Sequence, residues 1–453
     1  MAKSKVKRGF LYYLLIFCAL VLGLFCIFVA ILIFNPGKDV YGINLRYVSH
    51  HKEIIKYKST DTNTNIDDLA YTSVEFNSGS TDFEIEYDVD ATFTSVHFKP
   101  YVTALSKNEN TDFILKIELV GTKLVISVEE PELWLTFANR ASISFVCPKN
   151  KSFTNYDFNI NTQSGNVGIG DKTQRTYEVK SLNINTESGE VLIHNNMKVV
   201  SQNINIETKT GRIIANSNIT GTLNIENDSG KIDIGNLKSN LNIINHNKLE
   251  ADCTFVAKDT FIKSTNGYIR IGTLGENFSN GNFTTVDSAE NTNIVIEKMT
   301  GNATITNTTG YIVVNELGGQ ALIETTTGNV EINKVNNSCD ITTLSGSVNV
   351  TQLGETARTT VNTEKGNITL NFAEIGTANL TTKQANIFIN VVTGKPFILD
   401  YTTKNGIEAS WATTKLDDSG VIKVSGAEDS STKKIVAIAE NGKINVKEGF
   451  IVK

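Results

Sequence analysis

Residues that build metal sites, disulfide frameworks and catalytic centres are scarce in this chain of 453 residues. It contains 5 cysteines, 5 histidines and 2 tryptophans. Cys18 and Cys26 lie in an apolar run, and Cys147, Cys253 and Cys339 are far apart in the sequence. These positions exclude a disulfide framework and zinc-site spacing, but a single bridge among the last three cysteines stays open. Cys339 falls on an inward position of the repeat described below, which favours a small buried apolar side chain.

Positive charge is also in short supply. The formal net charge is −6 and the pI is about 5.6, so the basic surface that nucleic acid requires is missing and we predict no nucleic-acid partner. The sequence has no P-loop and no dinucleotide-binding fingerprint. GIGD at residues 168–171 is a single partial match to the G-G-x-G-x-D calcium-binding repeat, which is otherwise absent from the sequence. We therefore predict no cofactor.

The long apolar run lies near the N-terminus. Residues 10–34 carry no charged side chain and exceed the ~20 residues that a helix needs to cross a bilayer. A cleaved signal peptide is the alternative, but its apolar core would be only ~7–15 residues long and would end at a small-residue cleavage site. Basic residues, which stay on the cytoplasmic side, are denser before the run than after it: Lys3, Lys5, Lys7 and Arg8 against Lys38 and Arg46. We predict that residues 1–34 form a short cytoplasmic tail and a transmembrane signal anchor of a single-pass cell-membrane protein, with the bulk of the chain extracytoplasmic.

One short phrase recurs along the rest of the chain. TTTGNVEI at residues 325–332 has relatives in NTQSGNVGI, NTESGEVLI, NTTGYIVV, TTLSGSVNV and NTEKGNITL. Aligned on the glycine, the copies follow h-x-h-x-T-x-x-G-x-h-x-h-x-x-h, in which h is apolar. Alternation with period two on both sides predicts two strands, each with one buried face. The glycine provides a corner that other residues would adopt only with strain, and the preceding Thr, Ser or Asn can bond to local backbone.

The spacing of the copies predicts the architecture. Gly310, Gly328, Gly346 and Gly366 follow one another at intervals of 18, 18 and 20 residues. A period near ~20 residues is typical of solenoids, whereas a propeller blade needs ~40–45. We predict an all-β fold: a parallel β-solenoid of about 18–20-residue rungs over residues 151–453, with a C-terminal cap from about residue 394. Degenerate corners are expected in NHNKLE (245–250), near SAENTNIVIE (288–297) and at Ala385, and a second corner at Leu274-Gly275, Leu317-Gly318 and Leu353-Gly354.

Residues 35–150 contain strand-like runs separated by polar turns, which predicts a β-rich membrane-proximal neck. The stretch ASISFVCPKNKSFTNYDFNINTQSGNVGIGD, residues 141–171, resembles the entry to the bacterial "putative adhesin" family of β-solenoid domains of unknown function. The resemblance covers roughly residues 70 to 390. It implies a β-solenoid in a membrane-anchored or exported protein, and it implies no catalytic or binding residues.

Candidate reactive residues are few. His50 and His51, with Glu53, could bind a metal, but their polar surroundings favour a solvated linker, and His194 should face outward because it follows an inward position. We predict no paired acids that recur at rung spacing alongside Arg or Lys, so the acidic clusters are interpreted as solvated charge: Glu129, Glu130 and Glu132, and Asp417 and Asp418. We predict no catalytic, cofactor-binding or metal-binding residues.

Together these patterns predict a non-enzymatic, membrane-anchored β-solenoid that acts as an adhesin or as an interaction or scaffold protein of the cell envelope. The expected partners are the membrane, through the N-terminal helix, and a glycan or an envelope protein. Two alternatives stay open. One is a carbohydrate-active β-helix enzyme on a surface polysaccharide, and the other is a polymerising scaffold that resembles bactofilins.

Overall fold

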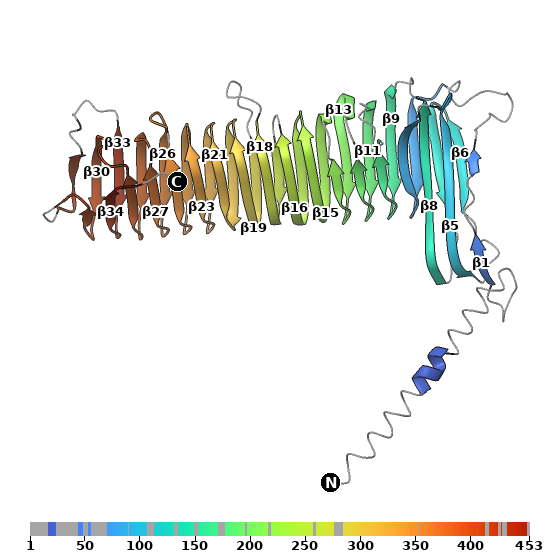
Figure 1. Cartoon of the computed structure of the whole chain (residues 1–453), viewed down its shortest axis with the longest axis horizontal. Coiled ribbons are helices and arrows are strands. Elements are labelled where there is room, and N and C mark those ends of the chain that lie inside the picture. The colour runs from blue at the N-terminus through green and yellow to red at the C-terminus, as the bar shows by residue number, and fades with distance from the viewer. Residues whose placement is uncertain are drawn as a thin grey trace, which may run out of the picture. The chain divides into compact units, whose positions relative to one another are not determined.

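The computed structural model is built from β-strands, as predicted (Figure 1). The chain divides into two compact units, Met1–Tyr71 with Glu75–Lys149, and Thr72–Val74 with Asn150–Lys453. The predicted boundaries of 1–34, 35–150 and 151–453 stay predictions. The residues that the structure describes are 17–23, 44–48, 53–55, 70–88, 90–106, 113–130, 135–148, 153–170, 177–194, 197–215, 219–256, 260–275, 284–352, 354–412, 416–424, 427 and 433–450.

The described part of the chain contains one helix, residues 17–23, inside the predicted membrane span. Among the residues described, no helix has the length and apolar character needed to cross a membrane. The rest of residues 1–34 lies outside the described residues, so the anchor stays a prediction.

The first unit is a mostly antiparallel β-structure. β5 pairs antiparallel with β1, β2 and β8, β6 and β7 form a hairpin, and β4 pairs parallel with β8. Its core contains Phe76 and Phe83, whose rings stack at a centroid distance of 4.4 Å. The strands are β1 (Asn44–Val48), β2 (Glu53–Ile55), β3 (Ser73–Ser78, which crosses the boundary between the units), β4 (Asp82–Asp88), β5 (Ser95–Ser106), β6 (Ile114–Val120), β7 (Lys123–Glu129) and β8 (Leu135–Pro148).

The second unit is a stack of rungs, and each rung contributes one strand to each of two parallel ladders. In the regular part, β22 pairs with β24 and β24 with β26, while β23 pairs with β25 and β25 with β27. Strands that are next but one in sequence are therefore neighbours in space, as a coil with two strands per rung requires. The registers Val330↔Val348 and Val348↔Ile368 reproduce the predicted rung lengths.

We call the two rows of strands ladder A and ladder B, and three long strands bend through the corner and belong to both. Ladder A comprises β9 (Phe153–Thr162), β11 (Tyr177–Thr186), β13 (Met197–Thr208), β17 (Thr260–Ser264), β20 (Ala303–Thr309), β22 (Ala321–Thr325), β24 (Ser338–Thr343), β26 (Arg358–Thr363), β28 (Thr377–Thr382), β30 (Phe397–Thr403) and β33 (Lys434–Ala439). Ladder B comprises β10 (Val167–Ile169), β12 (Val191–Ile193), β14 (Ile213–Ala215), β18 (Asn266–Leu274), β21 (Ile312–Leu317), β23 (Val330–Val335), β25 (Val348–Gln352), β27 (Ile368–Phe372), β29 (Ile387–Val391), β31 (Ile407–Ala409) and β34 (Ile444–Glu448). The shared strands are β15 (Ile219–Leu237), β16 (Leu241–Val256) and β19 (Thr284–Met299).

Alternate residues of each strand form the core. Ile225, Ile243 and Ile262 are in register on successive rungs of ladder A, and their exposed fractions are 2%, 0% and 0%. Burial of one such side chain contributes about 1.5–3 kcal/mol, and only a stacked neighbour on each side completes that burial. A one-residue slip of any rung would turn its apolar residues to solvent. The predicted inward positions, Cys339 among them, are confirmed.

The repeated glycine is required by the close approach of successive corners. A Cβ atom built on Gly346 would lie 1.8 Å from the carbonyl oxygen of Gly328, and one on Gly366 would lie 1.8 Å from that of Gly346. Neither glycine has a positive φ, although Gly310 does at 98°. Space between rungs, more than the left-handed conformation, therefore selects glycine at this corner.

Two side chains complete the corner. The Thr343 hydroxyl accepts a hydrogen bond from the backbone N–H of Gly346 at 3.0 Å, as predicted for the T-x-x-G phrase. Asn329, which follows Gly328, accepts a hydrogen bond through Oδ1 from the N–H of Ser347 on the next rung at 2.9 Å. The first bond holds the bend within a rung and the second joins rung to rung, which explains why a threonine three residues before the glycine recurs, in some copies with an asparagine after it.

Gly346→Ala should lower the free energy of unfolding by about 3 kcal/mol, because the added methyl group forces the corners apart. The matched control is Gly354→Ala, whose Cβ would have its nearest contact at 3.1 Å, with the carbonyl oxygen of Asn336. Its cost should stay below about 1 kcal/mol. Urea denaturation followed by far-UV circular dichroism measures both, and equal costs would contradict this account of the glycine.

The predicted degenerate rungs are present in the stack. Leu249 occupies the glycine position between Gly230 and Gly267, and Thr292 occupies it between Gly267 and Gly310. Leu249 is fully buried. Here the chain runs through the corner as one bent strand, so a residue other than glycine fits.

The last rungs are stacked out of sequence order. β33 pairs parallel with both β28 and β30, and β34 pairs parallel with both β29 and β31. The rung formed by β33 and β34 therefore lies between the preceding regular rung and the rung of β30 and β31, at the far end of the stack (Figure 1). β32 (Ser419–Val424) pairs antiparallel with β30 and ends the parallel stacking at that strand.

Ala437→Arg should expel this inserted rung, because Ala437 is fully buried on β33 and an unpaired charge there is costly. Residues 397–424 would lose their neighbour and should become sensitive to limited proteolysis, detected by mass spectrometry. Val436→Arg, at the adjacent outward position of the same strand, is the control and should keep the native cleavage pattern. Unchanged protection in both variants would contradict the inserted order.

Candidate functional site

A row of asparagines runs along the outer surface of ladder A. The asparagine row comprises Asn159, Asn183, Asn205, Asn224 and Asn242, which are in register on five successive rungs. Each Nδ2 donates to the Oδ1 of the preceding member, at 2.8, 2.7, 2.8 and 3.5 Å. Outward asparagine side chains thus form a ladder of hydrogen bonds between rungs.

The row lines a trough of about 450 Å³. The second row of lining residues lies two positions further along each strand and comprises Asn161, Asn185, Glu207, Glu226 and Ile244, with the inward isoleucines between the two rows. The trough is therefore lined by both amide or carboxylate groups and apolar isoleucine side chains. Its two rows run parallel to the direction in which the rungs stack.

The row ends because the next residue in register, Phe261, has no amide. The Oδ1 atom of Asn242 is buried without a hydrogen-bond partner, and the Phe261 side chain is 37% exposed. At the other end Asn159 contacts the Ser73 hydroxyl at 3.5 Å.

Beside Asn159, burial raises the pKa of the Asp157 carboxyl, but hydrogen bonds from Lys180 and Ser181 lower it, and the pKa is below its ordinary value.

Two carboxylates lie side by side in the trough. Glu207 and Glu226 are exposed and in register on adjacent rungs, and Nε2 of His246 lies 3.0 Å from Oε1 of Glu226. This pair was not among the residues predicted from the sequence. Its signal was the phrase N-I-E at residues 205–207 and again at 224–226.

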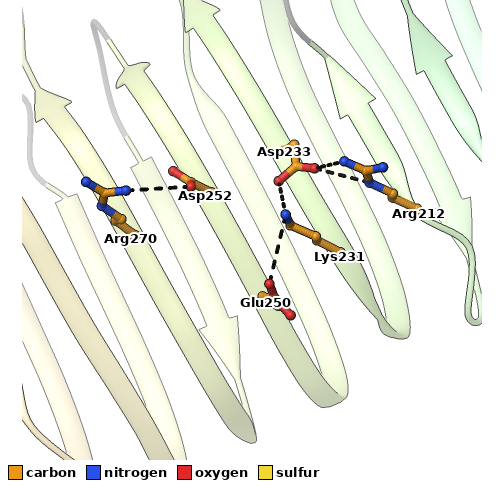
Figure 2. A network of polar contacts seen from close by, with 6 residues as sticks. All are labelled: Arg212, Lys231, Asp233, Glu250, Asp252 and Arg270. Atoms are coloured by element: carbon orange, nitrogen blue, oxygen red, sulfur yellow. Dashed lines mark hydrogen bonds and ion pairs between the residues drawn. The ribbon is translucent and has the colours of Figure 1, made fainter.

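The outer surface of ladder B carries a network of oppositely charged side chains (Figure 2). Its members are Arg212, Lys231, Asp233, Glu250, Asp252 and Arg270. Asp233 accepts a hydrogen bond from Nη2 of Arg212 at 2.5 Å, and its carboxylate lies 3.2 Å from Nζ of Lys231. The same Nζ atom lies 4.0 Å from the carboxylate of Glu250. The hydrogen bond to Asp233 raises the pKa of Arg212. The side chains of Arg212 and Lys231 are 47% and 42% exposed, and such surface pairs contribute little stability each. Asp233 and Asp252 are in register on adjacent rungs and lie beside Arg212 and Arg270. The expectation that no paired acids recur at rung spacing alongside Arg or Lys is therefore wrong for this surface. We interpret the network as a charged surface between rungs.

The described candidates from the sequence do not gather into a site. His50, His51, Glu132 and Asp171 lie outside the described residues, and the described part of the chain holds no cluster of metal-binding side chains. Glu129 forms an ion pair with Lys116, while Glu130 accepts hydrogen bonds from Ser80. His194 is half-buried next to the buried Ile193, and Asp417 and Asp418 are exposed.

The three cysteines beyond the apolar run, Cys147, Cys253 and Cys339, are free and buried. Burial, with smaller contributions from Asp252 and Asp233, raises the pKa of Cys253 to about 12. Burial and Asp340 raise the pKa of Cys339 in the same direction. Because only the thiolate is a strong nucleophile, these thiols are inert in the folded protein.

In a background of Cys18→Ser and Cys26→Ser, we expect native protein at pH 8 to resist alkylation by iodoacetamide. The same protein in denaturant should react at all three remaining cysteines, because unfolding removes the burial that raises the pKa of Cys253 and Cys339. Mass spectrometry of tryptic peptides measures the modification at each site. Rapid labelling of Cys253 under native conditions would contradict the packing described here.

Fold and surface define an all-β protein with a repetitive, parallel β-solenoid and a polar outer face. Residues 99–279 match the family model described as Toastrack DUF4097, a segment that includes all five rungs of the trough. The predicted relationship to an uncharacterised β-rich family is therefore confirmed for this segment.

Two solved structures are similar at low identity. One, described as a putative cell adhesion protein from Clostridium sporogenes ATCC 15579, is 10% identical with a TM-score of 0.16, over 88% of this chain and 99% of that chain. The other, described as a putative adhesin from Parabacteroides merdae ATCC 43184, is 12% identical with a TM-score of 0.20, over 72% of this chain and 96% of that chain. No curated protein matches the chain.

Proposed function

We propose that the chain is a non-enzymatic protein anchored in the cell membrane by residues 10–34, and that its β-solenoid acts outside the membrane as an adhesin or envelope interaction protein. The observation that carries the proposal is the asparagine row, which repeats one neutral hydrogen-bonding group on five rungs of an exposed surface. Repetition of this kind suits an extended partner. The uncharged span and its basic N-terminal flank support the anchor and its orientation.

An enzyme acting on a surface polysaccharide is the second candidate, and the pair Glu207 and Glu226 favours it. Paired carboxylates perform glycoside hydrolysis when one is kept protonated and the other ionised. Both side chains are exposed, and Glu226 contacts His246. Because neither side chain is enclosed within the fold, we favour binding.

A polymerising scaffold is the third candidate. Such an assembly needs an accessible parallel edge at each end of the stack. The antiparallel strand β32 on β30 argues against growth at the C-terminal end.

Topology is tested by adding protease to intact cells that produce the full chain with tags at both termini. We expect the C-terminal tag to be lost and the N-terminal tag to be retained, because the basic flank stays cytoplasmic. Replacement of Lys3, Lys5, Lys7 and Arg8 by Glu is the matched variant and should weaken this orientation. Retention of the C-terminal tag in otherwise accessible cells would contradict an extracytoplasmic solenoid.

Binding is tested with residues 35–453 on whole cells, isolated envelopes and immobilised glycans. We expect saturable binding above that of a denatured sample, and no shortening of a bound polysaccharide by chromatography. Glu207→Gln with Glu226→Gln should leave binding within about threefold. Cleavage that this double variant abolishes would support the enzyme, and an absence of binding across the panel would contradict the adhesin.

A further inference from the structure

We propose that the trough binds one neutral glycan chain, which lies along the stacking direction across the five rungs from β9 to β16. This inference rests on the proposed function and adds to it the site, the class of ligand and the direction of the bound chain.

The amides of the asparagine row keep hydrogen-bonding capacity for a ligand. An asparagine side chain has two donor hydrogens and two acceptor lone pairs. The row uses one donor and one acceptor of each internal member, Asn183, Asn205 and Asn224. Each of these side chains thus has one donor and one acceptor left for a partner that offers both. Sugar hydroxyl groups offer both at every residue of a glycan.

The repeat of the site suits a polymer. Neighbouring strands in a sheet are ~4.8 Å apart, so equivalent amides recur at that interval along the trough. A pyranose unit in an extended chain has a comparable length, and successive sugars can therefore meet successive amides. The row fixes its own side chains through the bonds between rungs, which lowers the entropy lost on binding.

Charge selects a neutral chain over an anionic one. The charged residues that line the trough are Glu207 and Glu226, and no Lys or Arg is among its described lining residues. Both carboxylates accept hydrogen bonds from hydroxyl groups and repel phosphate or uronate groups. Lys263, in register with Ile244, lies one rung beyond this lining.

Phe261 closes one end of the site with a different kind of contact. It follows Asn242 in the same outward column and is 37% exposed. An exposed aromatic ring offers an apolar surface to the C–H face of a sugar. A terminal sugar stacked there would continue the line of sugars bound to the asparagine row.

The test uses the full chain in detergent micelles and isothermal titration calorimetry. The probes are neutral linear oligosaccharides of glucose, of two to six units and with 1,3, 1,4 or 1,6 linkages, and galacturonate oligomers of the same lengths. We expect at least one neutral series to bind with an affinity that rises with length until the chain covers the five rungs. The galacturonate oligomers should bind at least about tenfold more weakly.

Asn205→Leu combined with Asn224→Leu should weaken the bound neutral series by about tenfold or more, and Phe261→Ala should weaken mainly the longest members. Asn333→Leu is the matched control, because Asn333 donates to Asn315 at 2.7 Å in a similar exposed pair on ladder B. It should leave the affinity unchanged. Far-UV circular dichroism and thermal unfolding verify that each variant is folded.

The outcomes separate the two proposals. If residues 35–453 bind cells but the double asparagine variant binds them equally well, the adhesin stands and the trough is not its site. Preference for galacturonate, no dependence on length, or an equal loss in Asn333→Leu overturns the neutral-chain inference. Absence of neutral oligosaccharide binding across all linkages overturns it as well, whatever the cells show.

Discussion

The close contact between successive corners is the constraint on which this solenoid depends. At the regular corners the backbone of one rung lies so near the preceding glycine carbonyl that a Cβ atom has no space. The threonine hydroxyl and the following asparagine then satisfy backbone N–H groups at the same place. Because the bend recurs at a fixed point of every regular rung, the strands on both sides of it remain in register.

Register links the core to the outer surface. The alternation that directs Ile184, Ile206 and Ile225 inward directs the neighbouring asparagines outward. Stacking then aligns both sets with the same spacing, so the polar row follows from the packing of the apolar one. A site made in this way has the period of the fold, which is why an extended, repeating ligand suits it better than a compact one.

The two ends of this order have different causes. The asparagine row ends within the stack, where a single aromatic residue replaces an amide and leaves the Oδ1 of Asn242 without a partner. The stack itself ends through a change in chain path. The rung of β33 and β34, which is last in sequence, is inserted between the rung of β28 and β29 and the rung of β30 and β31, and β32 pairs antiparallel with β30. The first is a local property of one side chain. The second involves residues separated by some 35 positions or more, such as Asn405 and Asn441.

The sequence by itself determined the all-β class, the rung length, the inward residues and even the degenerate corners around Leu249 and Thr292, because each depends on local alternation and on a fixed distance between repeats. Only the tertiary structure decided which columns become continuous. The alignment of Glu207 with Glu226, the end of the row at Phe261 and the insertion of β33 and β34 all depend on which rungs are neighbours in space. Rungs stack in sequence order along most of the solenoid. At its end, the rung of β33 and β34 instead takes the place next to β28 and β29. No local sequence pattern marks this exchange, because either rung offers the same backbone groups and alternating apolar residues.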